Sequence, residues 1–227
     1  MTSATPSRRS RLVELYHGTA DCERCPLSAT RNRVVFGSGN ADADLMFVGE
    51  APGAEEDRQG LPFVGRAGAL LSELLGEIGL RREDVFINNV LMCRPPGNRD
   101  PQPNEIESCS PFLQTRVELI QPKVIGTLGN FATKLLTGNQ TGITKVRGTP
   151  QVHVIGGRAV YLMPLLHPAA ALRTPSLIET LREDFRKLPE LLATPSPQEV
   201  AEARETGEPV AVGAVAGDDA DQLDLFG

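Results

Sequence analysis

The stretch DLMFVGEAPGAEEDRQGLPFVGRAGALLSELLGEIGL, residues 44–80, decides the fold. Its first seven residues, DLMFVGE, are an apolar run that ends in a polar loop, as expected of a buried strand. A loop rich in glycine, proline and charge follows. Apolar residues then recur at helical spacing from Leu70 to Ile78, and Gly79 marks the end of that helix. The stretch therefore predicts a buried strand, a long polar loop and an amphipathic helix.

The same alternation of strand and helix continues through the rest of the chain. We expect further strands in DVFINNVLMC (84–93), KVIGTLG (123–129), VHVI (152–155) and AVYLMPLL (159–166). We expect further helices over residues 8–17, 103–120 and 176–192, and one that ends at Leu136. This alternation predicts an α/β fold whose sheet is at least partly parallel.

Three unusual loops follow the predicted strands. They are GEAPG (49–53), the segment NNVLMCRPPGN (88–98) and LLHPAAALR (165–173). Ligands of parallel α/β sheets bind beyond the carboxyl ends of the strands. We therefore expect these loops to meet at one site.

Composition places the chain among globular proteins. It has 227 residues, of which 40% are hydrophobic, and no apolar run approaches the roughly 18 residues that a membrane span needs. The N-terminal sequence MTSATPSRRSR contains basic residues but no apolar segment, so it is not a secretory signal. We expect a cytoplasmic protein without a membrane partner.

The net charge of −6 comes from the C-terminal tail. Residues 193–227 contain eight acidic residues and one base, Arg204, so the preceding 192 residues carry a net charge of about +1. A nearly neutral body can still present a basic surface to nucleic acid. The tail has few apolar clusters, and we expect it to be disordered. We therefore divide the chain into an N-terminal segment, partly helical, over 1–20, a catalytic-type domain over 21–192 and the acidic tail over 193–227.

Four cysteines define a second feature. Cys22 and Cys25 form a C-x-x-C pair, and Cys93 and Cys109 lie fifteen intervening residues apart. A zinc ribbon normally has two close pairs, and a redox dithiol does not need the other two cysteines. Four thiolates also suit a [4Fe-4S] cluster. Spacing alone leaves open a cluster, a zinc site or unrelated buried thiols.

Several motifs together resemble one family. The segments GEAPGAEEDRQGLPFVGRAGALL, INNVLMCRPPGNRDP, ITKVRGTP and LLHPAAALR, with the four cysteines, look like the family 4 uracil-DNA glycosylases. The likeness runs in order from about Cys22 to Leu192. It implies a three-layer α/β/α sandwich around a mainly parallel sheet, with a [4Fe-4S] cluster on Cys22, Cys25, Cys93 and Cys109. The implied activity is base-excision repair: flipping uracil out of DNA and hydrolysing its N-glycosidic bond.

The resemblance assigns roles around the flipped base. The amide of Asn89, rather than that of Asn88, would accept from uracil N3–H and donate to O4. Phe63 would stack on the base, and Ala51 would approach its C5 edge, where crowding excludes the methyl group of thymine. From sequence alone, a turn asparagine and a core phenylalanine are equally ordinary interpretations.

The resemblance also implies the groups that act on charge and water. His167 would lie against uracil O2, where negative charge develops. A carboxylate, Glu50 or Glu56, would orient the attacking water and stabilise the sugar cation. The sequence does not choose between the two carboxylates.

Contacts with DNA and a partner complete the predicted set. Leu172 and Arg173 resemble the family loop that enters the duplex, and Lys145 and Arg147 would bind phosphates. The C-terminal DQLDLFG resembles the peptide with which bacterial repair proteins bind the sliding clamp; its matching residues are Gln222, Leu223, Leu225 and Phe226.

We therefore expect a monomeric, nucleoid-associated glycosylase acting on uracil-containing DNA. One alternative is a catalytically silent DNA-binding or clamp-binding protein on the same fold. Another is an electron-transfer or zinc-stabilised module. Excision of uracil separates the first from these, and the metal content separates a cluster from zinc.

Overall fold

The computed structural model describes residues 6–206. At its centre lies a six-stranded sheet with the order β1-β3-β2-β4-β6-β5. The strands are β1 (Ser38–Gly39), β2 (Leu45–Gly49), β3 (Phe86–Asn89), β4 (Val124–Leu128), β5 (Gln151–Ile155) and β6 (Arg158–Leu165). The four inner strands are parallel, and β1 and β5 add antiparallel edges. The prediction of a mainly parallel sheet is confirmed.

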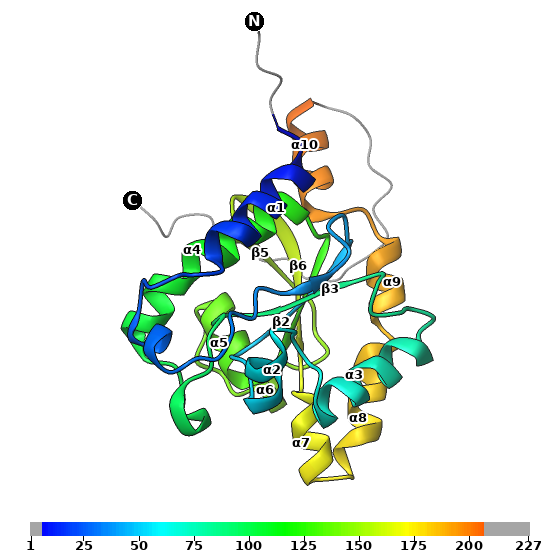
Figure 1. The fold of residues 1–227 in the computed structure, drawn as a ribbon. Coiled ribbons are helices and arrows are strands. Elements are labelled where there is room, and N and C mark those ends of the chain that lie inside the picture. Colours follow the sequence, from blue (N-terminus) through cyan, green and yellow to red (C-terminus); the bar gives the residue numbers. More distant parts are fainter. Residues whose placement is uncertain (1–5, 207–227) are drawn as a thin grey trace, which may run out of the picture.

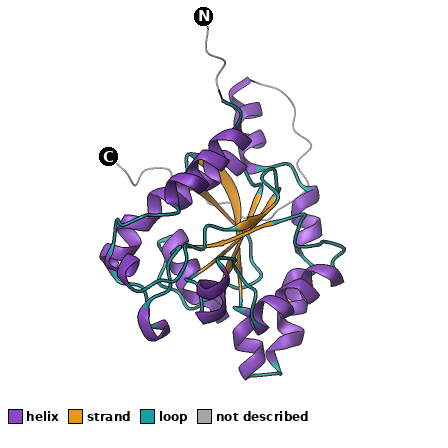
Figure 2. Ribbon diagram, viewed as in Figure 1, coloured by secondary structure: helices purple, strands orange, loops and turns teal. Residues whose placement is uncertain are grey.

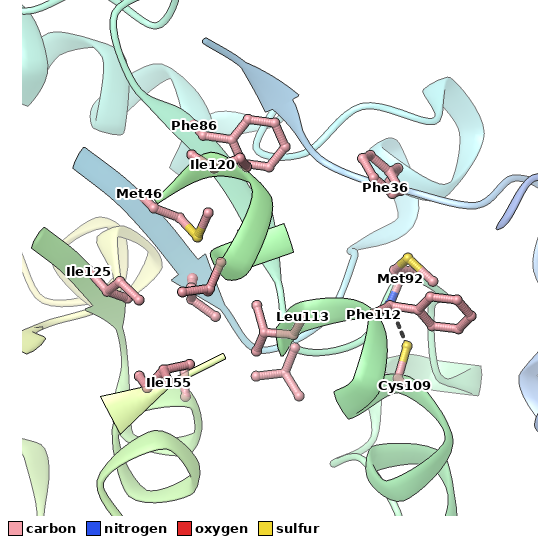
Figure 3. Close-up of a cluster of buried hydrophobic side chains, with 14 of the residues drawn as sticks. Phe36, Met46, Phe86, Met92, Cys109, Phe112, Leu113, Ile120, Ile125 and Ile155 are labelled. Atoms are coloured by element: carbon pink, nitrogen blue, oxygen red, sulfur yellow. Dashed lines mark hydrogen bonds between the residues drawn. The ribbon is translucent and has the colours of Figure 1, made fainter. Parts of the chain in front are cut away.

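Helices cover both faces of this sheet (Figures 1 and 2). One layer contains α1 (Arg8–Thr19), α4 (Pro103–Ile120) and α5 (Asn130–Thr137). Its apolar side chains, among them Phe112, Leu113 and Val117 of α4, pack on Met46 of β2 and Phe86 of β3. Part of this packing is drawn in Figure 3. The residues of β2, β3 and β4 are buried throughout, whereas the edge strands β1 and β5 are partly exposed.

The opposite layer contains α3 (Arg66–Glu77), α8 (Leu177–Phe185) and α9 (Leu188–Ala193). Leu71 and Leu74 of α3, with Phe185 of α8, are fully buried against strand residues such as Phe47. Phe47 and Phe185 stack with their ring centroids 5.8 Å apart. Two apolar layers around one sheet make the three-layer α/β/α sandwich that the sequence predicts.

Short helices lie in the connections between these elements. They are α2 (Ala54–Gln59), α6 (Ile143–Val146), α7 (Pro168–Arg173) and two 3-10 turns, η1 (Pro26–Ala29) and η2 (Pro96–Asn98). None of them has the length at which apolar periodicity can be recognised in a sequence. The sequence therefore predicts no helix in these segments.

Local chemistry sets the ends of the long helices. Helix α4 begins with Pro103 and a capping box, in which Gln102 and Glu105 exchange side-chain to backbone bonds. The expected helix over 176–192 is two helices, α8 and α9. Pro189, in the first turn of α9, has no N–H to continue the α8 ladder, so the helix is interrupted there.

The region after residue 193 differs from the expectation of a disordered tail. Helix α10 (Pro197–Thr206) contacts β6, and the Gln198 side chain accepts a bond of 3.1 Å from Ala159 N. The Tyr161 hydroxyl also donates to Pro195 O at 3.2 Å. The ordered domain thus extends at least to residue 203, whereas residues 207–227 lie outside the described part of the chain.

Within residues 6–206, no helix combines the length and apolarity that crossing a bilayer requires.

Candidate active site

A cavity of about 990 Å³ opens at the carboxyl ends of the four parallel strands. The segments that follow β2, β3, β4 and β6 all contribute to its wall, as the loop positions predict. Seven of the predicted site residues line it: Glu50, Ala51, Glu56, Phe63, Asn89, His167 and Arg173. Residues that are more than 100 positions apart thus meet at one edge of the sheet.

Strand alternation decides between the two neighbouring asparagines. Asn89 pairs with Gly49 in the sheet register, lines the cavity and is 2% exposed. Asn88, one residue earlier, points to the opposite face because side chains alternate along a strand. Its amide is buried and has no hydrogen-bond partner among the described residues. The geometry places Asn89, not Asn88, at the cavity.

Gly49 leaves room for Asn89 and Phe63 to approach each other. A Cβ added at Gly49 would collide with the Asn89 amide oxygen, and it would lie 2.9 Å from the Phe63 ring. The backbone of Gly49 does not need a positive φ, since it continues β2. Space, rather than backbone freedom, therefore requires glycine at this position.

The loop before α3 holds Phe63 in an unusual conformation. Phe63 has a φ of 52°, in the left-handed region that bulky residues rarely adopt. Arg82 donates from its two terminal nitrogens to Phe63 O at 2.9 Å and to Pro62 O at 2.8 Å. Gly68 lies so close to the Phe63 carbonyl that no side chain fits between them. These contacts fix the Phe63 ring at the cavity wall.

His167 ends the segment after β6 and caps α7. Its Nδ1 accepts a bond of 3.1 Å from Ala169 N, so the neutral ring carries its proton on Nε2. Burial is the largest cause that lowers the pKa of His167 to about 4; the charge of Arg173 acts in the same direction, and Glu56 opposes both. The ring centroids of His167 and Phe63 are 5.6 Å apart. At neutral pH, His167 is therefore an uncharged donor beside an aromatic face.

The two candidate carboxylates have different surroundings. Glu56 Oε1 accepts from Val64 N and Gly65 N, both at 3.1 Å, and so caps the start of α3. The carboxylate of Glu50 has no hydrogen-bond partner among residues 6–206. Burial raises the pKa of Glu50, and the nearby charge of Asp100 raises it further. Glu50 is thus the carboxylate that is available to a water molecule.

The two other acids of the same loop are engaged elsewhere. Glu55 pairs with Arg58, and the buried Asp57 accepts from the backbone and the amide of Asn32. Neither residue lines the cavity. Each of the three carboxylates of α2 therefore has its own partner within the described residues.

The loop RPPGNRD, residues 94–100, forms another wall of the cavity. Its residues belong to a motif that resembles the family, but the resemblance assigned no role to their side chains. Asn98 and Asp100 line the cavity, and Asn98 accepts from Arg94 Nε at 2.7 Å. Arg99 binds both oxygens of the buried Glu105, which anchors the loop to α4. The polar residues that follow the predicted strand over 84–93 were the available signal for this wall.

On the other side, α5 and the segment after it supply residues that the sequence analysis also missed. Asn130, Lys134 and Gln140 line the cavity there. They follow β4, and none of the motifs that resemble the family includes them. They add amide and cationic groups to the cavity wall.

The four predicted DNA contacts occupy three kinds of position. Leu172, 37% exposed, and the exposed Arg173 lie in α7 at the rim, and Lys145 is exposed on α6. Arg147 is different, because its Nη1 lies 2.7 Å from the fully buried Asp184 of α8. Phosphate binding by Arg147 stays a prediction, but its guanidinium already has a carboxylate partner.

All four cysteines line a second, small pocket between η1, the end of the β3 segment and α4. None of the four forms a disulfide, and Cys93 and Cys109 are buried. Met92 N donates to Cys109 Sγ at 3.4 Å (Figure 3), and Arg31 Nη1 lies 3.8 Å from Cys93 Sγ. Burial raises the pKa of Cys93 to about 12, although Arg31 opposes the shift.

This pocket unites residues that are far apart in sequence. Within the described part of the chain, no three His, Cys, Asp or Glu side chains are placed to hold a single metal ion. The donor set nevertheless fits a larger anionic group held by thiolates, because a cationic and a backbone N–H group point at the sulfur atoms. The predicted grouping of the four cysteines agrees with this geometry.

Comparison with known proteins places the chain in a family. A family model described as the uracil DNA glycosylase superfamily matches residues 36–197. The chain is 48% identical over 189 residues to a type-4 uracil-DNA glycosylase of Sulfurisphaera tokodaii, covering 81% of this chain and 86% of that one. It is 46% identical to the type-4 enzyme of Archaeoglobus fulgidus, with 82% and 96% covered.

A bacterial relative gives the same result. Over 169 residues the chain is 50% identical to the type-4 uracil-DNA glycosylase of Thermotoga maritima, covering 73% of this chain and 86% of the relative. The match to the superfamily model covers all the parallel strands and the cavity that they form. On fold, site and sequence, the chain belongs to the uracil-DNA glycosylase superfamily and, within it, to the type-4 uracil-DNA glycosylases.

Proposed function

We propose that the protein excises uracil from DNA by hydrolysing its N-glycosidic bond, as a step of base-excision repair. The observation that carries this proposal is the meeting of Asn89, Phe63, His167 and Glu50 around one cavity. Each supplies a different function that the reaction requires: reading the base, stacking, stabilising charge and orienting water.

Recognition rests on the cavity wall. A flipped uracil lies with its face on Phe63 and its Watson–Crick edge at the Asn89 amide. The amide oxygen accepts from N3–H and the amide nitrogen donates to O4, whereas cytosine presents the opposite pattern. Ala51 lies at the C5 edge, where it crowds a thymine methyl group.

Bond cleavage uses the remaining groups. As the bond between C1′ and N1 breaks, the sugar gains positive charge and the leaving uracil gains negative charge. The Nε2–H of neutral His167 donates to O2, where that negative charge develops. The Glu50 carboxylate holds the water that adds to C1′ and stabilises the sugar cation. Glu56 keeps the Phe63 loop on the start of α3.

Cys22, Cys25, Cys93 and Cys109 would hold a [4Fe-4S] cluster in the second pocket. When bound, the cluster cross-links the N-terminal segment to the β3 segment and α4 and supplies a redox-capable group. The nearest protein groups, Met92 N and Arg31, stabilise the thiolates. A protein with four iron atoms per chain and broad visible absorbance fits this assignment, and equimolar zinc without iron contradicts it.

DNA enters from the rim. Leu172 fills the stack that the flipped base vacates, and Arg173, Lys145 and Arg147 approach phosphates. Binding should weaken with salt because these cations release counterions from the DNA. The enzyme acts as a monomer in the cytoplasm, where it meets the chromosomal DNA.

The last residues add a partner. Gln222, Leu223, Leu225 and Phe226 lie outside the described residues, and their sequence alone supports docking into a groove of the sliding clamp. Deleting residues 222–227 should abolish clamp binding in a pull-down with purified clamp. Uracil excision from a short oligonucleotide should be unchanged.

The test of the main proposal is excision from a defined substrate. A single-stranded or duplex oligonucleotide with one uracil is incubated with the protein and then treated with alkali, which cuts at abasic sites. Strand cleavage at uracil, but not at cytosine or thymine, is expected. Iron-loaded protein that leaves uracil intact but binds the oligonucleotide would support the silent binding protein instead.

The matched variant is Asn89→Ala. On the proposed mechanism it reduces excision to a low residual rate and leaves binding to undamaged DNA unchanged. In a silent binding protein it would alter only binding.

A further inference from the structure

Arg116 is a fully buried arginine in α4. It is 0% exposed, and it has no ion pair with a carboxylate among residues 6–206. Its guanidinium donates only to backbone carbonyls: to Phe36 O, to Phe112 O at 3.1 Å and to Asn89 O at 3.4 Å. It also lies 5.3 Å from the centroid of the Phe36 ring. A charge buried with carbonyl dipoles alone is costly, so the position needs a reason.

The first reason for a buried arginine at this position lies in the cysteine pocket. Arg116 follows Cys109 by seven residues, about two helical turns, so both side chains lie on the same buried face of α4. Burial lowers the pKa of Arg116, and the negative charge of a Cys109 thiolate partly offsets this by favouring the charged guanidinium. Arg31 approaches the same pocket from outside, at Cys93. A group held by four thiolates is anionic, and Arg116 is a buried cation on the same face of α4 as Cys109.

The second reason lies in the cavity. The Asn89 peptide carbonyl that Arg116 binds belongs to the residue whose side chain lines the cavity. Phe36, the second carbonyl partner, precedes β1, which pairs with Phe86 and Ile87 of β3, the strand that ends at Asn89. The planar guanidinium binds both carbonyls at once, which a lysine ammonium at the end of a flexible stem cannot reproduce.

We propose that Arg116 is a positioning residue that couples the two sites: its charge neutralises the cysteine-bound group, and its guanidinium fixes the Asn89 peptide. This inference rests on the proposed function, since it needs both the cluster and the reading of uracil by Asn89. Arg116 contacts neither DNA nor uracil, and it acts on excision only through Asn89.

Two variants separate the two roles. Arg116→Lys keeps the positive charge but loses the fork, whereas Arg116→Met keeps the aliphatic volume and loses both. Arg182→Gln is the control, because Arg182 pairs with Glu73 and Glu77 on the outer surface of α3 and α8. Iron content, the rate at which visible absorbance is lost in air, kcat and KM are measured for each purified protein.

The expected results differ between the variants. Arg116→Met should lose absorbance about 10- to 100-fold faster than the wild type and lower kcat by a similar factor. Arg116→Lys should keep the absorbance but lower kcat about tenfold with little change in KM. Arg182→Gln should match the wild type. In an Asn89→Ala background, Arg116→Lys should leave the residual kcat unchanged within about twofold, as expected if both act through one group.

Each other outcome contradicts the proposal in a defined way. Wild-type cluster retention in Arg116→Met refutes the role of the charge, and wild-type kcat in Arg116→Lys refutes the role of the fork. Failure of both variants to fold, while Arg182→Gln folds, assigns Arg116 to general core stability and overturns the proposal. A wild-type protein that neither holds iron nor excises uracil refutes the proposed function instead, before any variant is compared.

Discussion

Replacing Glu50 and Glu56 separately by glutamine distinguishes the carboxylate that acts on water from the one that caps a helix. Both line the cavity, and the family resemblance allows either role. Glu56 Oε1 accepts two backbone N–H groups at 3.1 Å, and the amide oxygen of glutamine can accept the same bonds. Glu50 has no such bond among the described residues. Glutamine therefore keeps the structural role of Glu56 but removes the chemical role of Glu50.

The magnitudes follow from these contacts. Glu56→Ala loses a helix cap worth about 0.5–2 kcal/mol, which at about 2–4 °C per kcal/mol lowers Tm by about 1–8 °C. Glu56→Gln loses only the interaction of the charge with the helix dipole, about 0.3–1 kcal/mol. Its excision rate should stay within about tenfold of the wild type, whereas Glu50→Gln should fall about 10²- to 10⁴-fold.

The effect of Glu50→Gln on stability has the opposite sign to that of Glu56→Ala. Burial and Asp100 raise the pKa of Glu50 in the folded protein. A raised carboxyl pKa contributes stability only at low pH, and this contribution is lost as pH rises through the folded pKa. At neutral pH the ionised Glu50 therefore disfavours the fold, and Glu50→Gln should leave Tm unchanged or slightly higher.

The assay is single-turnover excision from a uracil oligonucleotide, with thermal unfolding of the same preparations. An inactive Glu56→Gln with wild-type Tm, beside an active Glu50→Gln, would reverse the two roles and refute the argument from hydrogen bonding.

Three further predictions concern the rest of the cavity. The His167 ring should titrate near pH 4 by NMR, and excision should be insensitive to this group between pH 8 and about 5. Because its pKa is lowered, the stability that the neutral ring contributes above its usual pKa of about 6.5 is lost as pH falls to about 4. A ring that titrates near 6.5 would contradict this. Arg82→Met removes two charged hydrogen bonds, should cost about 1.5–3 kcal/mol in urea unfolding and should lower kcat/KM by releasing Phe63, whereas unchanged kinetics would show that the loop holds itself. Gly49→Ala should abolish excision because the added Cβ forces Asn89 and Phe63 apart. An active Gly49→Ala would show that the two side chains do not need to meet.

Much of the fold follows from the sequence because its apolar periodicity is strong. The leucines of α3 and the apolar runs of β2 and β4 are buried as their spacing predicts. The break between α8 and α9 depends on a single proline, Pro189, inside an otherwise periodic segment. The docking of α10 depends on Gln198 and Pro195, whose partners on β6 no local pattern identifies.

The site was predictable in its members but not in their pairings. The motifs place Asn89, Phe63 and His167 at the strand ends. Nothing local indicates that Glu56 caps α3, or that Arg147 pairs with Asp184, which lies 37 residues later. The conformation of Phe63 cannot be predicted from the sequence around it, because Gly68 in α3 and Arg82 in the turn after α3 impose it.

The packing of α1 on α4 has a consequence for biosynthesis. Arg11 of α1 pairs with Glu118 at 3.1 Å, and Arg8 donates to Leu119 O at 3.5 Å. Helix α1 leaves the ribosome before α4, and this partner surface is made about a hundred residues later. At about 5–20 residues per second, α1 waits roughly 5–20 s before it can dock. Chaperones that scan nascent chains therefore meet Leu12 exposed, and α1 is fixed in place only after α4, although α1 is made earlier.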